Sequence, residues 1–359
     1  MPEIRILTAE DREEWKKLVE MLPVKDIFYS QDYLEINADA AGFKAEMFVY
    51  EEGDNMILYP YLKKPIHVLP FLEKQKDNKK MYDITTLEYG GPAARLSDEV
   101  RDGGKQLFKE FKKEFNRYCR QNSIITEWAR LHPFIENHKL TEESEHVKDV
   151  YYINLSRQED EIVDGFEKRN RNSISKSKRS GVTVKRSKDR DNLDAFYSIY
   201  CETMDRRKAE GFYYYSRDFF DDLIRKLGDS VQLFLAKHDG KTIGASFFLA
   251  ENDIVHYYLS GMDHGYSRYC PNNIILKEAI LWAKNKGFRI FNLGGGYSAG
   301  DSLSKFKSGF SSTQVPFYRY TKVHNKEAYE SLCELKRSYD KEKNIKGDPH
   351  YFPLYRGKT

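Results

Sequence analysis

The sequence predicts an α/β (α+β) protein built from two copies of one structural unit. The chain has 359 residues, which is more than one typical core organises. Its apolar residues alternate repeatedly between helical and strand periodicity. The same order of elements also occurs before and after residue 150. We therefore expect a first domain over 1–150, a second over 151–325, and a C-terminal helix and tail over 326–359.

The first half is predicted from apolar periodicity and from turn residues. Two apolar runs around Gly53 predict a hairpin, and a row of apolar side chains on one side predicts a long amphipathic helix. The expected elements are, in order, a helix from Thr8 to Pro23, a short helix over 28–43, the hairpin over 45–64, an irregular polar insertion over 63–88, a strand and turn over 84–94, the amphipathic helix over 104–122 and a strand over 123–131.

The second half repeats this order of helix, hairpin, strand, long helix and strand. Ser156 and Glu159 have the spacing of a capping box, and Gly181 is expected to close the helical region that they open. The expected elements are a strand over 150–156, that helix, a strand over 182–186, helices over 191–207 and 216–228, three strands over 231–261, a helix over 271–287 and a strand over 288–293.

The cysteines and the N-terminus predict a cytoplasmic protein. The four cysteines form no CxxC pair, which favours reduced thiols. The N-terminus is charged from its third residue and lacks an apolar signal region. No apolar run reaches the roughly 18 residues that a membrane span requires. We therefore expect no stable insertion into a membrane.

Positive charge is concentrated between residues 165 and 190. This segment holds ten Lys and Arg residues against two acidic residues, an excess of +8 in a chain of net charge +3, so the remainder is net −5. Crowding of like charges on a helix is unfavourable. The alternatives are a solvated helix face and a binding surface for an anion such as a phosphate group or RNA. The candidate contacts are Lys168, Arg169 and Arg171.

The glycine-rich stretch 291–310 invites comparison with a nucleotide phosphate loop. Gly294 and Gly296 match the first two positions of GxGxxG, but Ala299 occupies the third. A dinucleotide fold carries this turn in its first βα unit, whereas here it lies near the end of the second domain. The triphosphate motif GxxxxGK[ST] is absent. We therefore interpret the glycines as a tight turn after a buried strand.

Two further kinds of site are not supported by the sequence. SxxK matches occur at both 173–178 and 302–307, so they are background in a chain rich in Ser and Lys. The nine histidines include no HExxH motif, and His256 and His264 are isolated in sequence. We therefore expect neither a serine–lysine catalytic pair nor a metal site.

The second half contains a distinctive combination of stretches: SGMDHGYSRYCPNNIILKEAILWAKNKGFRIFNLGGG (260–296), then LSKFKSGF (303–310), and before them the basic helix that ends at Gly181. In this combination the sequence resembles the FemAB-like branch of the GNAT acyltransferase superfamily. The resemblance implies two tandem GNAT-like domains, each with a mixed, largely antiparallel sheet flanked by helices. It also implies acyl transfer from aminoacyl-tRNA to an amine of a peptidoglycan precursor, without a covalent enzyme intermediate or a tightly bound cofactor.

The resemblance also implies the roles of individual residues. Lys307 is expected at the transfer site, where its ammonium would stabilise the developing oxyanion. The remaining implied substrate contacts are Phe306, Tyr258, Tyr297, Arg207 and its neighbour Arg206. The general base is left open between Asp301 and Glu278.

Departures from the family pattern leave the substrates open. Asn37 stands where a substrate-binding lysine is common, and Ala94 and Arg95 stand where an aspartate is expected. SRYCPNNI (267–274) lacks the glycines with which acyl-CoA-dependent members hold a pyrophosphate. The partner is expected to be a nucleotide-linked or lipid-linked anionic precursor, with tRNA as donor carrier. The alternatives are an acyl-CoA-dependent N-acyltransferase acting on an amino sugar or another small amine, and a non-catalytic protein that binds RNA or another polyanion.

Overall fold

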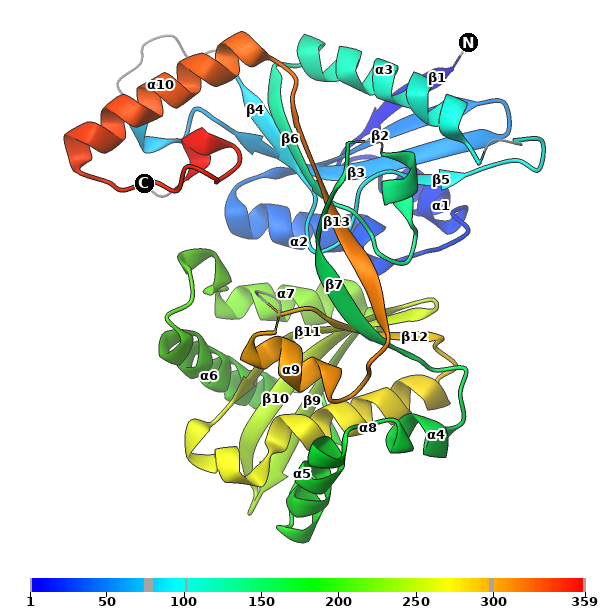
Figure 1. Cartoon of the computed structure of the whole chain (residues 1–359), viewed down its shortest axis with the longest axis vertical. Coiled ribbons are helices and arrows are strands. Elements are labelled where there is room, and N and C mark those ends of the chain that lie inside the picture. The colour runs from blue at the N-terminus through cyan, green and yellow to red at the C-terminus, as the bar shows by residue number, and fades with distance from the viewer. Residues whose placement is uncertain (1, 74–79, 101–102, 142, 297–299, 358–359) are drawn as a thin grey trace. The chain divides into compact units, whose positions relative to one another are not determined.

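The computed structural model describes residues 2–73, 80–100, 103–141, 143–296 and 300–357, and it contains two compact units (Figure 1). The first unit comprises Met1–Pro23, Phe28–Val147 and Phe317–Thr359, and the second comprises Val24–Ile27 and Lys148–Pro316. This division differs from the predicted boundaries, because the C-terminal helix and tail lie within the first unit.

The first unit is built on a mixed sheet in the strand order β1-β2-β3-β4-β6-β13, with β5 paired to β3. The pairing of β4 with β6 is parallel, and the other described pairings are antiparallel. The strands are β1 (Glu3–Leu7), β2 (Lys44–Glu52), β3 (Asn55–Pro65), β4 (Tyr82–Thr85), β5 (Ala93–Arg95), β6 (Ile124–Arg130) and β13 (Gln314–Val323). The insertion expected over 63–88 thus contains the end of β3 and all of β4.

Helices cover both faces of this sheet (Figure 1). The helix α3 (Lys105–Gln121) packs Phe108, Phe111 and Phe115 onto aromatic residues of β2 and β3. On the other face lie α1 (Arg12–Glu20) and α2 (Gln31–Ala41). The aromatic spacing that predicted an amphipathic helix is therefore the spacing that buries it.

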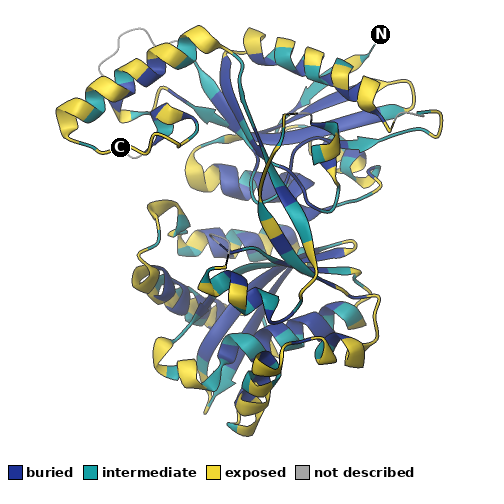
Figure 2. Ribbon diagram, in the orientation of Figure 1, coloured by how far each residue is buried: buried dark blue, intermediate teal, exposed yellow. Residues whose placement is uncertain are grey.

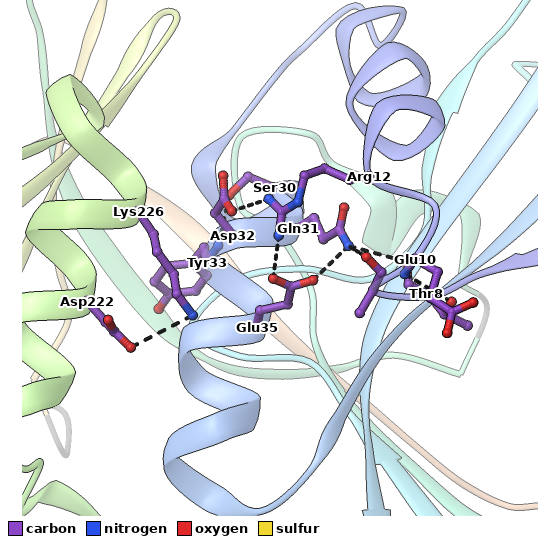
Figure 3. Close-up of polar contacts among 11 residues, drawn as sticks. Thr8, Glu10, Arg12, Ser30, Gln31, Asp32, Tyr33, Glu35, Asp222 and Lys226 are labelled. Atoms are coloured by element: carbon purple, nitrogen blue, oxygen red, sulfur yellow. Dashed lines mark hydrogen bonds and ion pairs between the residues drawn. The ribbon is translucent and has the colours of Figure 1, made fainter.

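Short-range chemistry fixes α1 and α2. The Ser30 side chain accepts a hydrogen bond from the backbone N–H of Tyr33, which caps the start of α2, and Gly42 ends α2 with φ of 68°. Figure 3 shows the Arg12 guanidinium between the carboxylates of Asp32 and Glu35. The Arg12–Glu35 separation is 2.6 Å. Such partly exposed ion pairs contribute up to about 1 kcal/mol, so they orient the two helices more than they stabilise them.

The C-terminal segment belongs to the first unit because it is paired and buried there. β13 pairs with β6 from Arg319↔Arg130 to Val323↔Thr126. The following helix, α10 (Lys326–Lys343), buries Leu332 and Cys333 in a cluster with Ile125 of β6 and with Ile66, which follows β3. Hydrogen bonding along a strand and apolar burial along a helix therefore join the chain end to the first sheet.

The second unit contains a sheet in the order β7-β12-β11-β10-β9-β8. Only the pairing of β11 with β12 is parallel among the pairings described within this sheet. The strands are β7 (Glu145–Asn154), β8 (Thr183–Arg186), β9 (Val231–His238), β10 (Lys241–Glu251), β11 (Ile254–Met262) and β12 (Ile290–Gly294). Three antiparallel strands, a long helix and a parallel strand thus occur in both units, which confirms the predicted tandem arrangement.

The second sheet also has a helical layer on each face. Figure 2 shows the inner side of α8 buried, whereas most of α5 is exposed. The helices α6 and α7 pack on the other face through Phe196 and Phe220, which contact Phe247 of β10. The helices are α4 (Glu159–Asp164), α5 (Lys168–Arg179), α6 (Arg190–Arg207), α7 (Arg217–Leu227), α8 (Pro271–Asn285) and α9 (Ser302–Ser308).

The predicted capping box lies two residues too early. The structure caps α4 with Gln158 and Glu161. The side chain of Asn154 accepts a hydrogen bond from Ser156 N–H at 2.9 Å, which forms a turn in place of a first helical residue. The region up to Gly181 is also two helices, α4 and α5, separated at 165–167.

A buried ion pair anchors the chain end. The Arg356 Nε lies 2.5 Å from Oδ2 of Asp83, whose side chain is 3% exposed. The hydroxyl groups of Tyr355 and Thr126 donate to the other carboxylate oxygen at 2.5 and 2.6 Å. The carboxylate therefore has three partners, which compensate for the loss of hydration.

We expect Arg356→Ala to lower the free energy of unfolding of the first unit by about 3 kcal/mol, because Asp83 keeps its hydroxyl donors but loses its counter-ion. Urea unfolding of the purified chain measures this change. Arg337→Ala, which removes an exposed arginine of α10, is the control and should shift stability by less than about 0.5 kcal/mol. Equal effects of the two variants would contradict the anchoring role.

Candidate active site

The candidate site lies where the two parallel strands of the second unit separate. The ladder between β11 and β12 contains three residue pairs and ends at His256↔Asn292. β11 continues to Met262, and the register of β10 against β11 shifts between Ser246↔Ser260 and Phe248↔Tyr257. This shift is a bulge, which re-aims side chains. The carboxyl ends of diverging parallel strands are a common position for a ligand site in α/β proteins.

Lys307 places a buried ammonium at this position. It lies on α9, is 8% exposed, and its Nζ donates a hydrogen bond to the carbonyl oxygen of Gly295 at 2.9 Å. The same Nζ lies 5.8 Å from the centre of the Tyr257 ring. A buried charge requires such partners. The carbonyl oxygen and the ring face both interact favourably with the ammonium.

The glycines before α9 form the turn that presents this carbonyl. Gly294 has φ of 71°, a conformation that favours glycine. A Cβ on Gly296 would lie 2.3 Å from Oδ1 of Asp301, which caps α9 by accepting from Ser304 N–H. The carbonyls of Gly295 and Gly296 accept from Lys307 and Lys148. These carbonyls thus face cations, which agrees with a tight turn and not with a cradle for phosphate oxygens.

Tyr257 supplies the aromatic wall of the site. Its ring stacks on Phe248, and its hydroxyl donates to Oγ of Ser260 at 2.7 Å. Burial raises the pKa of Tyr257, while the Ser260 hydroxyl and the charge of Arg207 act in the opposite direction. The phenol is therefore protonated at neutral pH and serves as a hydrogen-bond donor.

The sequence named the neighbouring Tyr258 and missed Tyr257. Side chains alternate along a strand, so adjacent tyrosines point to opposite faces. The faces of β11 could have been separated by its apolar pattern, because Val255 and Tyr257 both pack toward α8. Tyr258 is half-buried on the same strand and remains a predicted contact.

The other implied contacts lie at different positions. Phe306 packs into the core of the second unit, with its ring edge-on to Phe310 at 5.5 Å. Arg206 and Arg207 occupy the exposed last turn of α6, and only Arg207 influences the pKa of Tyr257. Tyr297 lies outside the described residues. The structure thus brings Lys307 and Tyr257 together.

Two cations of the basic segment cap neighbouring helices. Arg169 donates to the carbonyl of Lys305 at 2.9 Å, near the end of α9, and Arg171 donates to the carbonyl of Asp164 at 2.6 Å, at the end of α4. Positive groups at helix ends complement the helix dipole. Lys168 is exposed at the start of α5. The basic segment therefore includes both capping residues and an exposed cationic surface.

Both residues that were considered as general base have structural contacts. Asp301 caps α9, as described above. Glu278 of α8 lies 3.1 Å from Nζ of Lys277 and 3.9 Å from Nζ of Lys178. These structural contacts account for the positions of both carboxylates without a role in proton transfer. The general base of the reaction stays unassigned.

Comparison with known proteins defines the class of the chain. The model of the acetyltransferase (GNAT) domain family matches residues 166–308, which include the site. The crystal structure of FemX superposes with a TM-score of 0.68 at 14% identity, over 92% of this chain and 99% of FemX. A tandem GNAT protein from the clavulanic acid biosynthesis pathway superposes with a TM-score of 0.52 at 8% identity, over 90% of this chain and 99% of that one. The fold is therefore a tandem GNAT fold.

A sequence relative narrows the class. UDP-N-acetylmuramoylpentapeptide-lysine N(6)-alanyltransferase of Weissella viridescens is 25% identical over 151 residues, which make up 41% of this chain. The match spans 44% of the length of that relative. Together with the domain match and the fold, it confirms the resemblance to the FemAB-like branch of the GNAT superfamily that the sequence shows.

Within the described parts of the chain, each helix is too short or too polar to cross a bilayer.

We expect Lys307→Met to lower the turnover of acyl transfer by about 10²–10³-fold, because the loss of one charged donor at a developing oxyanion has an effect of this size. Steady-state kinetics with the purified variant measures it. Lys305→Met is the matched control, since Lys305 is exposed on the same helix. Wild-type turnover in the folded Lys307 variant would exclude the role.

Proposed function

We propose that the chain transfers an aminoacyl group from aminoacyl-tRNA to an amine of a cell-wall precursor. The observation that carries the proposal is the buried Lys307 ammonium, held by Gly295 where β11 and β12 separate. The match to an alanyltransferase supports the choice of an aminoacyl group.

The reaction that this geometry supports is a direct displacement. The acceptor amine attacks the ester carbonyl, a C–N bond forms, and the carbonyl oxygen gains negative charge beside the Lys307 ammonium. The C–O bond to the ribose then breaks. The amine loses one proton and the departing ribose oxygen gains one, so the charges balance. Positioning and oxyanion stabilisation would supply most of the acceleration.

The start of α8 favours this donor over acyl-CoA. Pro271 is the first residue of α8 and has no N–H to offer a phosphate. The carbonyls of Tyr269 and Cys270 accept hydrogen bonds from Oγ of Ser177, at 2.6 and 3.2 Å, so α5 packs against the loop. A Cβ on Gly244 would lie 2.8 Å from Pro271, so β10 lies against the same helix end. This helix start does not have the N–H-rich form that binds pyrophosphate.

The basic face of α5 is compatible with tRNA. Lys176, Lys178 and Arg179 are exposed in its last turn, and Nζ of Lys178 lies 3.9 Å from a carboxylate oxygen of Glu278. Exposed cations of this kind bind a phosphate backbone without reading its sequence. A protein that only binds RNA is the second candidate function, favoured by this surface alone.

Two residues of the first unit bear on the acceptor. Asn37, at the position where a lysine is common in the family, is buried in the first unit and donates to the carbonyl of Tyr33 at 2.8 Å. Arg95 of β5 donates to the carbonyl of Asp54 at 3.2 Å. Both side chains therefore have contacts within their own unit. We propose an anionic, amine-bearing cell-wall precursor as the class of acceptor.

Transfer assays test the proposal directly. The purified chain should move a labelled amino acid from a mixture of aminoacyl-tRNAs to the amine of a UDP-linked muropeptide. It should leave acetyl-CoA unused. Acetyl transfer without aminoacyl transfer would favour the acyl-CoA alternative. Stabilisation by uncharged tRNA with no turnover of any donor would favour the RNA-binding alternative; a ligand at 100 times its Kd raises the free energy of unfolding by about 2.7 kcal/mol.

A further inference from the structure

A chain of three buried polar side chains runs through the second unit. Nε2 of His256 lies 2.7 Å from Oδ2 of Asp26, and Nδ1 of His256 lies 3.0 Å from Nδ2 of Asn292. Their exposed fractions are 1% for Asp26, 3% for His256 and 1% for Asn292. These residues are far apart in sequence, and the sequence gives no reason to connect them.

The hydrogen-bond directions along this chain are determined by its ends. The amide nitrogen of Asn292 can only donate, so Nδ1 of His256 accepts and its Nε2 carries the hydrogen that is donated to Asp26. The amide oxygen of Asn292 in turn accepts from the backbone N–H of Gly294 at 2.8 Å. The network thus ends on the first glycine of the turn that precedes α9.

The network lies at the end of the parallel ladder. His256 and Asn292 form the last residue pair between β11 and β12. Their neighbours Val255, Phe291 and Leu293 belong to the core beneath α8. Because side chains alternate along strands, the network occupies the opposite face of the sheet from Tyr257. Its described connection to Lys307 runs through the backbone of the turn, from Gly294 N–H to the Gly295 carbonyl.

Asp26 comes from an unexpected part of the chain. It lies in Val24–Ile27, the short segment between the first two helices that belongs to the second unit. Burial of a carboxylate is costly, and a buried polar network often stabilises less than an apolar substitute would. Such a network does, however, favour one arrangement of its side chains. Here that arrangement fixes the geometry of the ends of β11 and β12.

We propose that Asp26, His256 and Asn292 are positioning residues that fix the Gly294–Gly295 turn and, through it, the ammonium of Lys307. The importance of that ammonium for turnover rests on the proposed function, whereas its positioning does not. The network therefore acts on the chemistry through the backbone and without touching the substrate.

Competitive acetylation of lysines tests the positioning without any assay of function. The folded chain is treated with trace acetic anhydride, and mass spectrometry gives the relative rate at each lysine. We expect Asn292→Ala and Asp26→Ala to acetylate Lys307 about three- to tenfold faster than the wild type, the factor that corresponds to one lost hydrogen bond. The rate at Lys305 should not change.

Two variants separate positioning from a loss of stability. Asn192→Ala removes another buried asparagine of the second unit, whose side chain donates to Asp189, the residue that caps the start of α6, and it should leave Lys307 unchanged. Asp26→Asn keeps an acceptor for the His256 N–H and should restore the wild-type rate at Lys307 even if Asp26→Ala folds poorly. In the transfer assay, Asn292→Ala should lower kcat about tenfold with an unchanged KM for the acceptor.

Unchanged Lys307 reactivity in folded Asn292→Ala and Asp26→Ala would overturn the proposal. The same rise in the acetylation rate of Lys307 in Asn192→Ala would also overturn it, because the rate would then depend on the stability of the second unit and not on the network. If acetylation changes as expected while no donor is turned over by the wild type, the positioning stands and the proposed function fails.

Discussion

The site depends on one constraint, the early end of the pairing between β11 and β12. After three residue pairs the parallel strands separate, and within the described residues their ladder ends there. Backbone groups at such an end must find other partners. The Asn292 side chain accepts a hydrogen bond from the Gly294 N–H, and the Lys307 ammonium donates one to the Gly295 carbonyl. The same feature that interrupts the sheet thus creates the position in which an ammonium can be buried.

Glycine and helix capping make this arrangement possible. Gly294 adopts a positive φ, and Gly296 leaves room for the Asp301 carboxylate that starts α9. The helix then directs Lys307 back toward the strand ends. From the other end of α9, Arg169 binds the carbonyl of Lys305, so α5 contributes to the placement of the same short helix. Charge, capping and backbone geometry therefore act on one side chain, and a change in any of them is expected to move it.

The sequence predicted what depends on local patterns. Apolar spacing located the hairpin of β2 and β3, the helices α3 and α8 and the repeated order of elements, because periodicity reports burial directly. It also proposed Lys307 as a site residue, although only through the resemblance to a family. It missed Tyr257 and the contact of Asp26 with His256. The position of Tyr257 depends on which face of β11 turns toward α8. The contact of Asp26 with His256 joins residues 230 positions apart, and no local sequence pattern reports such a contact. The capping box was displaced because Asn154 formed an unexpected turn.

Chemical rescue tests most directly the claim that the charge of Lys307 accelerates the transfer. In Lys307→Ala, added alkylammonium ions from methylamine to butylamine can enter the space that the side chain leaves. Turnover of the muropeptide should rise with the concentration of the amine and saturate, whereas a neutral alcohol of the same length should have no effect. Mass spectrometry of the product separates this rescue from acylation of the added amine. Equal rescue by the alcohol, or full turnover without any addition, would contradict the account.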